Sequence, residues 1–125
     1  MSIPVAEMRE PTYFVLASLL DGPLHGYAII KRTAELSGGR VRMATGTLYT
    51  ALDRLAAEGY IRPVSEEIVN GRARRSYGLT EPGASALRAE AARMTAAAAI
   101  VTSRRRARAA RPAASPGASP GVSPA

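Results

Sequence analysis

The chain has no cysteine and no tryptophan, and its 125 residues include a single phenylalanine and a single histidine. The absence of cysteine excludes disulfides, thiol catalysis and cysteine-ligated zinc. His25 has no second histidine as a co-ligand, so we expect no metal site and no cofactor. Because the sequence shows neither a nucleophile–base pair nor a phosphate-binding loop, we do not expect an enzyme.

Long apolar runs are also missing. None approaches the roughly 18–20 residues that a membrane span needs, and the N-terminus lacks the basic and apolar segments of a signal peptide. We therefore expect a cytoplasmic protein with no membrane partner. The length suits one domain plus appendages, with a small aliphatic core that dimerisation would help to stabilise.

The net charge of +7 is distributed unevenly. Residues 103–125 hold 5 of the 17 basic side chains and no acidic one, whereas the rest of the chain carries 12 basic and 10 acidic side chains. The body is thus only mildly basic. A polyanionic partner is favoured, and the alternative is a solvated basic tail.

Apolar spacing predicts two helices in the first forty residues. The first begins near Pro11 and ends at Asp21-Gly22-Pro23, and its apolar residues are Tyr13, Leu16, Leu19 and Leu20. The second runs from Gly26 to about Leu36, with one face made of Tyr27, Ile30 and Ala34. His25 is expected to help form the turn before it. Tyr27 either packs in the core, which we favour, or touches DNA.

Two further helices are predicted at 45–58 and 81–108. Thr45 is the expected N-cap of the third helix, whose apolar stripe is Leu48, Leu52 and Leu55. Thr80 is the expected N-cap of the fourth. The fourth helix has a heptad-like stripe, typical of packing on a partner helix, made of Leu87, Ala91, Met94, Ala98 and Val101. We expect residues 1–10 to form a flexible arm and residues 109–125 a disordered tail.

Asn70-Gly71 predicts a hairpin within residues 64–79, because a type I′ turn needs positive φ at both central positions. The pairs set opposite each other by this turn are Val69 with Arg72, Glu67 with Arg74, Glu66 with Arg75, and Val64 with Tyr77. Two acid–arginine pairs fall into register together, which favours this alignment.

The third helix has a small, hydroxyl-rich edge opposite its leucines, and the hairpin is rich in arginine. This combination is what a winged helix needs to bind duplex DNA, with hydroxyls on phosphates or base edges and Gly46 allowing close approach. The alternatives are a solvated helix edge and arginines occupied by Glu66 and Glu67. The expected fold class is mainly α (α+β): a winged helix-turn-helix over residues 11–80 with a two-stranded wing, followed by a long C-terminal helix over 81–108.

The segments His25–Tyr27, Gly46–Leu55, Glu58–Ile61 and Gly71–Thr80 resemble, in order and spacing, the PadR family of transcriptional regulators. The resemblance runs from about Tyr13 to about Leu87. It implies a phosphate contact by Tyr49, a palindromic operator, and dimerisation through the C-terminal helix with help from the first helix. The expected DNA-binding residues are Tyr27, Thr45, Gly46, Thr47, Tyr49, Thr50, Arg54, Arg72, Arg74 and Arg75. The expected dimer contacts are Leu16, Leu87, Ala91, Met94, Ala98 and Val101.

With this resemblance we expect a homodimeric transcriptional regulator, most readily a repressor that would act by occluding polymerase, although the residues themselves do not distinguish a repressor from an activator. One alternative is a regulator released from DNA by a small-molecule effector at the dimer interface. Some short members of the PadR family stack flat aromatic ligands on tryptophan, which this chain lacks. Another alternative is a protein-interaction module that has kept the fold but lost the DNA site, against which the Gly46–Tyr49 edge and the wing arginines argue.

Overall fold

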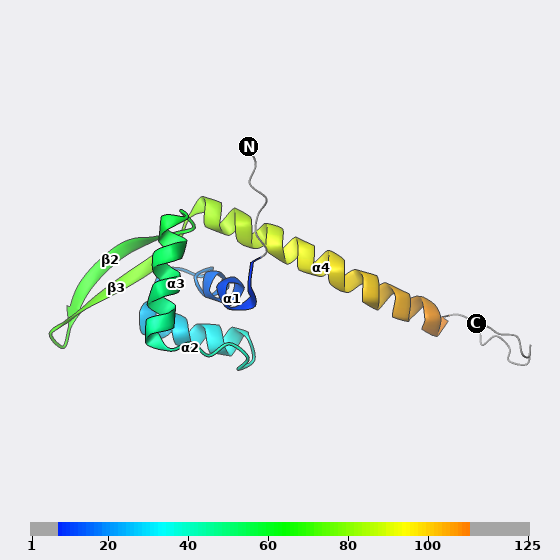
Figure 1. Cartoon of the computed structure of the whole chain (residues 1–125), viewed down its shortest axis with the longest axis horizontal. Coiled ribbons are helices and arrows are strands. Elements are labelled where there is room, and N and C mark those ends of the chain that lie inside the picture. Colours follow the sequence, from blue (N-terminus) through cyan, green and yellow to red (C-terminus); the bar gives the residue numbers. More distant parts are fainter. Residues whose placement is uncertain (1–7, 111–125) are drawn as a thin grey trace, which may run out of the picture. The chain divides into compact units, whose positions relative to one another are not determined.

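The computed structural model describes residues 8–110 (Figure 1). The elements in chain order are helix α1 (Glu10–Ser18), strand β1 (Leu24–His25), helices α2 (Gly26–Leu36) and α3 (Thr45–Ala57), strands β2 (Ile61–Val69) and β3 (Arg72–Leu79), and helix α4 (Glu81–Ala110). This architecture confirms the expected α+β winged helix-turn-helix with a long C-terminal helix. Most of the predicted arm and tail lies outside the described residues, although α4 continues to Ala110 instead of ending at 108.

The chain divides into two compact units, Met1–Ala91 and Ala92–Ala125. The core of the first unit is aliphatic, as the composition predicts. Its fully buried side chains come from four elements and include Leu16, Ile29, Leu48, Leu52, Leu55 and Ile61. The predicted stripe of α3 is confirmed, since all three of its leucines are at 0 % exposure. Leu20 was expected to continue the apolar face of α1 but is 60 % exposed, because the helix ends at Ser18.

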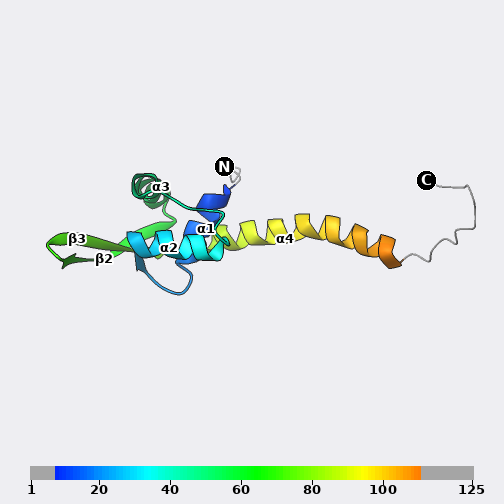
Figure 2. The ribbon, with the colours of Figure 1, turned by 90° about the horizontal axis from the view of Figure 1, so that it is seen from below.

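The sheet has three strands in the order β1-β3-β2, all antiparallel. Asn70 and Gly71 both have positive φ, as the predicted type I′ turn requires. The pairs Val69–Arg72, Glu67–Arg74 and Glu66–Arg75 are confirmed. The fourth is wrong: Tyr77 pairs with Pro63, because a bulge between Pro63 and Ser65 leaves Val64 without a partner. Both views show the hairpin projecting beyond the helices of the first unit (Figures 1 and 2).

Strand β1 was not predicted. Its two residues extend the sheet, with Leu24 opposite Tyr77 and His25 opposite Ser76. His25 then becomes the N-cap of α2, where its Nδ1 atom accepts a hydrogen bond from the Ala28 N–H at 3.3 Å. The expected turn-forming role of His25 is therefore confirmed. This residue ties the start of α2 directly to the wing strand β3.

The ends of α3 and α4 explain how the hairpin is joined to the helices. Ala44, not Thr45, is the N-cap of α3, so Thr45 is the first helical residue and its hydroxyl is released from capping. Gly59 follows α3 with φ 84°, and the Tyr60 N–H donates to the Leu55 carbonyl at 2.9 Å, which is a Schellman ending. The Thr80 hydroxyl accepts from the Gly83 N–H at 3.1 Å, which confirms Thr80 as the cap of α4.

The predicted orientation of α2 is wrong. Its buried residues are Gly26, Ile29 and Thr33, whereas Tyr27 is 73 % exposed, so the core position favoured for Tyr27 is excluded. Thr33 is accommodated in the core because its hydroxyl reaches the Phe14 carbonyl at 3.5 Å. A polar residue in the sequence thus belongs to the buried face of the helix, and an aromatic one to its surface.

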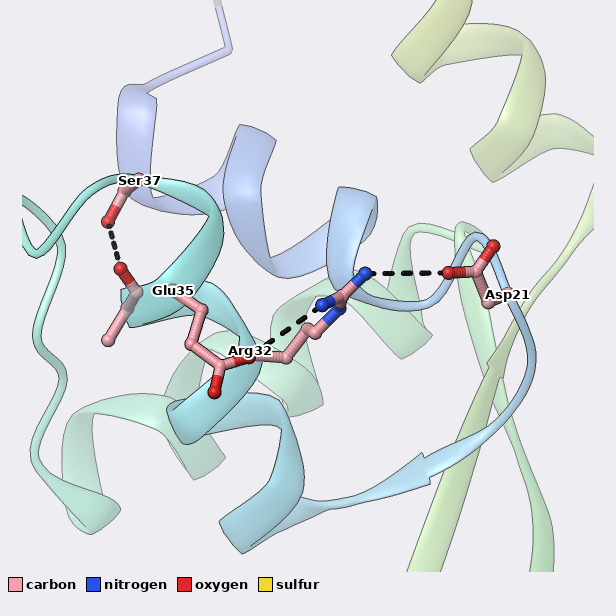
Figure 3. A network of polar contacts seen from close by, with 5 residues as sticks. Asp21, Arg32, Glu35 and Ser37 are labelled. Atoms are coloured by element: carbon pink, nitrogen blue, oxygen red, sulfur yellow. Dashed lines mark hydrogen bonds and ion pairs between the residues drawn. The ribbon is translucent and has the colours of Figure 1, made fainter.

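The surface of α2 carries a small polar network (Figure 3). Arg32 lies 3.5 Å from Asp21 and 3.7 Å from Glu35, so one guanidinium contacts two carboxylates. At the end of the helix the buried Ser37 hydroxyl donates to the Ala34 carbonyl and accepts from the Val41 N–H at 2.9 Å. These contacts fix the beginning of the loop that leads into α3.

Beyond Ala91, the described part of the chain is the continuation of α4. Its larger apolar side chains are exposed: Met94 at 45 %, Ile100 at 59 % and Val101 at 70 %. Among residues 8–110, no helix is both long enough and apolar enough to cross a bilayer.

Candidate nucleic-acid interface

The N-terminal half of α3 presents a polar edge to solvent. While Leu48, Leu52 and Leu55 are buried, the opposite edge is exposed and consists of Thr45, Gly46, Thr47, Tyr49 and Thr50. Within the described chain, no protein group hydrogen-bonds the hydroxyls of the three threonines. A row of uncommitted hydroxyls on a helix of this size can reach phosphates or base edges in a major groove.

Two glycines, Gly46 and Gly26, differ in the space around them near this edge. A Cβ built on Gly46 meets no atom within 4 Å, so the backbone there is open to an external partner. A Cβ built on Gly26 would lie 2.8 Å from Cζ of Tyr49 and closer still to its hydroxyl oxygen. The Tyr49 ring therefore rests on the first turn of α2 in space that only glycine leaves free. Tyr49 remains 39 % exposed, so it is both a strut between helices and a surface group.

The three wing arginines do not point the same way. Successive strand residues alternate between the faces of a sheet, so Arg72 and Arg74 share one face and Arg75 lies on the other. Hydrogen bonding to the Tyr77 hydroxyl, and then the charge of Glu66, raise the pKa of Arg75 above its ordinary value. Arg75 is thus the wing arginine whose charge is favoured by Tyr77 and Glu66. In the part of the chain that the structure describes, neither Arg72 nor Arg74 forms an ion pair, although Glu67 lies opposite Arg74.

A groove of about 380 Å³ joins these parts. We call it the wing groove, and its lining comes from the start of α2, from α3 and from the hairpin tip: His25, Gly26, Tyr27, Tyr49, Val69, Asn70, Arg72, Ala73 and Arg74. Two arginines and two tyrosine side chains share this concave surface. Four of the expected DNA-binding residues, Tyr27, Tyr49, Arg72 and Arg74, are brought together here.

Arg54 is held elsewhere. Its guanidinium donates to the Thr12 hydroxyl at 3.2 Å and lies 3.7 Å from Glu58, so it links α3 to α1. We therefore leave Arg54 out of the proposed interface.

The expected dimer contacts also need correction. Leu16 is at 0 % exposure and Leu87 at 4 %, both within the core of the first unit, so neither has surface left to offer a partner. Ala91 is partly buried. The exposed members of the predicted stripe are Met94, Ala98 and Val101. Among the described residues, no group of three acidic or histidine side chains is arranged to hold a metal ion.

Two basic residues that were not among the expected site residues lie on the outer face of α2 and in the loop after it. They are Lys31 and Arg42, and they line a second groove next to Tyr27. The signal was available in part, because Lys31 stands one helical turn after Tyr27 and Arg42 three residues before Thr45. Their convergence depends on the path of the 37–44 loop, which the sequence pattern does not specify.

Comparison with known proteins gives consistent results. Residues 15–89, more than half of the chain, match the Transcriptional regulator PadR-like family. The chain is 43 % identical over 74 residues to the transcriptional regulator Rv3488 of Mycobacterium tuberculosis, covering 58 % of this chain and 64 % of that protein. It is 45 % identical over 83 residues to an uncharacterized 37.1 kDa protein of a Streptomyces fradiae transposon, covering 66 % of this chain and 22 % of that protein. The chain thus spans less than two thirds of either relative.

Solved structures show the same fold. A PadR family transcription regulator from Clostridium difficile superimposes with a TM-score of 0.63 at 22 % identity, over 76 % of this chain and 97 % of that one. Bacillus subtilis PadR, solved in complex with operator DNA, superimposes with a TM-score of 0.57 at 28 % identity, over 64 % of this chain and 46 % of that one. With the winged-helix architecture and the family match over residues 15–89, the chain belongs to the PadR-like family of transcriptional regulators.

Proposed function

We propose that this chain binds duplex DNA in a sequence-specific manner through the exposed edge of α3 and the wing groove. The observation that carries the proposal is the open backbone at Gly46 among unpartnered hydroxyls, next to a groove that holds Arg72 and Arg74. Such an edge suits a major groove, and the two arginines suit the adjacent phosphates or minor groove. The operator complex of Bacillus subtilis PadR supports this assignment by analogy.

We further propose that the protein is a homodimer acting as a repressor on a palindromic site. The supporting observation is the exposed apolar surface of α4, where Met94 and Val101 share the predicted stripe. Burying these side chains in a second copy would remove apolar area from water. Two DNA-binding units related by a two-fold axis read a site with the same symmetry. Release from DNA by a small molecule remains a prediction from the sequence.

Gly46→Ala tests the DNA-binding surface directly. The free protein has room for the added methyl group, so folding is retained and any loss of affinity comes from the partner. We expect operator binding to weaken by about 1–3 kcal/mol, the range for one disturbed specific contact. The probe is a duplex selected by the parent protein from a random pool, measured by fluorescence anisotropy at fixed salt.

Ala57→Ser is the matched control, since it adds one heavy atom at the exposed far end of the same helix. It should bind the selected duplex as the parent does. The proposed surface is wrong if Gly46→Ala binds as tightly as this control. DNA binding itself is refuted if selection from the random pool yields no preferred sequence and no retained duplex.

A further inference from the structure

A second groove, of about 560 Å³, runs along the outer face of α2. It is separate from the residues assigned to the interface except at Tyr27. We call it the α2 groove, and the side chains that matter here are Tyr27, Ile30, Lys31, Glu35, Arg42 and Met43. Ile30 and Met43 are partly buried, whereas Lys31, Glu35 and Arg42 are exposed.

The uncompensated charge of the α2 groove is positive. Its one carboxylate, Glu35, lies 3.7 Å from Arg32, which stands outside the lining and also contacts Asp21 (Figure 3). Within residues 8–110, neither Lys31 nor Arg42 has an acidic partner. Arg42 is oriented by one hydrogen bond, from its Nε to the Gly39 carbonyl at 3.2 Å, which leaves its charge unmatched.

Tyr27 lines both grooves. In the wing groove it shares the lining with Arg72 and Arg74, and in the α2 groove with Lys31 and Arg42. The two grooves therefore meet at Tyr27, near the start of α2, and each contributes two cations. Arg42 also precedes the first residue of α3 by three positions, so the α2 groove reaches the loop that leads into the exposed edge of α3.

We infer that Lys31 and Arg42 form a second phosphate-binding surface, over which the backbone of the bound duplex continues past Tyr27. This inference rests on the proposed function and extends its footprint to α2 and the 37–44 loop. A polyanion fits better than a small ligand, because small-molecule sites enclose most of their ligand. Here Tyr27 is 73 % exposed and both cations are exposed.

The double variant Lys31→Ala/Arg42→Ala tests the inference. Each phosphate contact contributes about 0.9 to the slope of log K against log salt, so losing two contacts per subunit lowers the slope by about 2, or by about 4 in a dimer. Because phosphates carry no sequence information, the loss should be similar on the selected duplex and on random DNA. The matched control is Arg62→Ala/Arg88→Ala, which removes the same charge from exposed positions outside both grooves and should leave the slope nearly unchanged.

The outcomes separate the inference from the proposed function. If the double variant keeps the parent's salt slope while Arg72→Ala lowers it, the α2 surface is refuted and the wing interface stands. If the parent binds no duplex, the proposed function fails first. An equal loss of slope in the control double variant would also overturn the inference, since general charge and not position would then explain it. Unchanged thermal melting of each variant confirms that the fold is intact.

A second measurement locates the contact. Neutral methylphosphonates are placed one at a time along the selected duplex, and affinity is measured for the parent and the double variant. We expect positions that weaken the parent but have no further effect on the variant. If every position weakens both proteins equally, Lys31 and Arg42 do not touch the backbone, and a different occupant of the α2 groove is indicated.

Discussion

Replacing Gly83 with alanine should lower the free energy of unfolding, although alanine has the higher helix propensity. Gly83 is buried in the first turn of α4, where its N–H donates to the Thr80 hydroxyl. A Cβ built on it would overlap the Tyr60 carbonyl oxygen and would lie 2.9 Å from the Tyr60 carbonyl carbon. Both atoms belong to backbone, so no flexible side chain can move aside.

The expected change in the free energy of unfolding combines three contributions: helix propensity, steric overlap and one disturbed hydrogen bond. Alanine in place of glycine favours a helix by about 0.5–1 kcal/mol. Against this, forcing a methyl group into a filled space typically costs about 1–3 kcal/mol. The same Tyr60 carbonyl accepts from the Thr80 N–H at 3.0 Å, and disturbing that hydrogen bond costs about another 1 kcal/mol. We expect a net destabilisation of about 1–3 kcal/mol, which for a domain of this size lowers Tm by roughly 5–20 °C.

Gly46→Ala serves as the opposite case in the same assay. Gly46 is also helical and has no atom within 4 Å of its built Cβ, so the propensity term acts alone and Tm should stay level or rise. Both variants are melted at the same protein concentration, because association would make Tm depend on concentration. Equal Tm values for the two variants would show that α4 does not meet Tyr60 as described and would refute the reasoning.

Two further predictions concern α3 and α4. Gly26→Ala should displace the Tyr49 ring and lower the free energy of unfolding by only about 1 kcal/mol, because a side chain can move aside. The affinity for the operator, measured by fluorescence anisotropy, should fall. An unchanged affinity would mean that the position of the ring does not matter for binding. Met94→Glu should dissociate the proposed dimer, because it places like charges at a buried interface. An intact dimer in sedimentation would show that the interface lies outside this stripe. The control is Ser85→Glu, at an exposed position on the same helix outside the stripe.

The hairpin could be predicted from sequence almost residue by residue. Asn70-Gly71 specifies one turn type, and that turn sets the register of the pairs nearest to it. The predicted register is wrong at Val64, because a β-bulge is a local irregularity that the alternation of apolar and polar residues does not predict. Strand β1 escaped prediction because two residues are too short to show a period.

The candidate site could be predicted only in part. The polar edge of α3 follows from helical spacing opposite three leucines, and those leucines are buried. The face of α2 could not be predicted in the same way, since Thr33 is buried through a hydrogen bond to the Phe14 carbonyl while Tyr27 remains outside. That choice depends on a contact between two helices. The same reason hides Lys31 and Arg42, whose common groove is created by the turn of the 37–44 loop.

The position of Tyr49 shows that the proposed DNA-binding surface depends on more than α3. Its ring occupies the space above Gly26, so the start of α3 is fixed against the start of α2. His25 caps α2 and also pairs with Ser76 of β3, so the same helix start is fixed against the wing. The exposed edge of α3 and the wing strand are therefore fixed relative to each other through two adjacent residues, His25 and Gly26. A substitution that loosens either residue should change the spacing between α3 and the wing, and should therefore lower the affinity of the DNA binding that we propose.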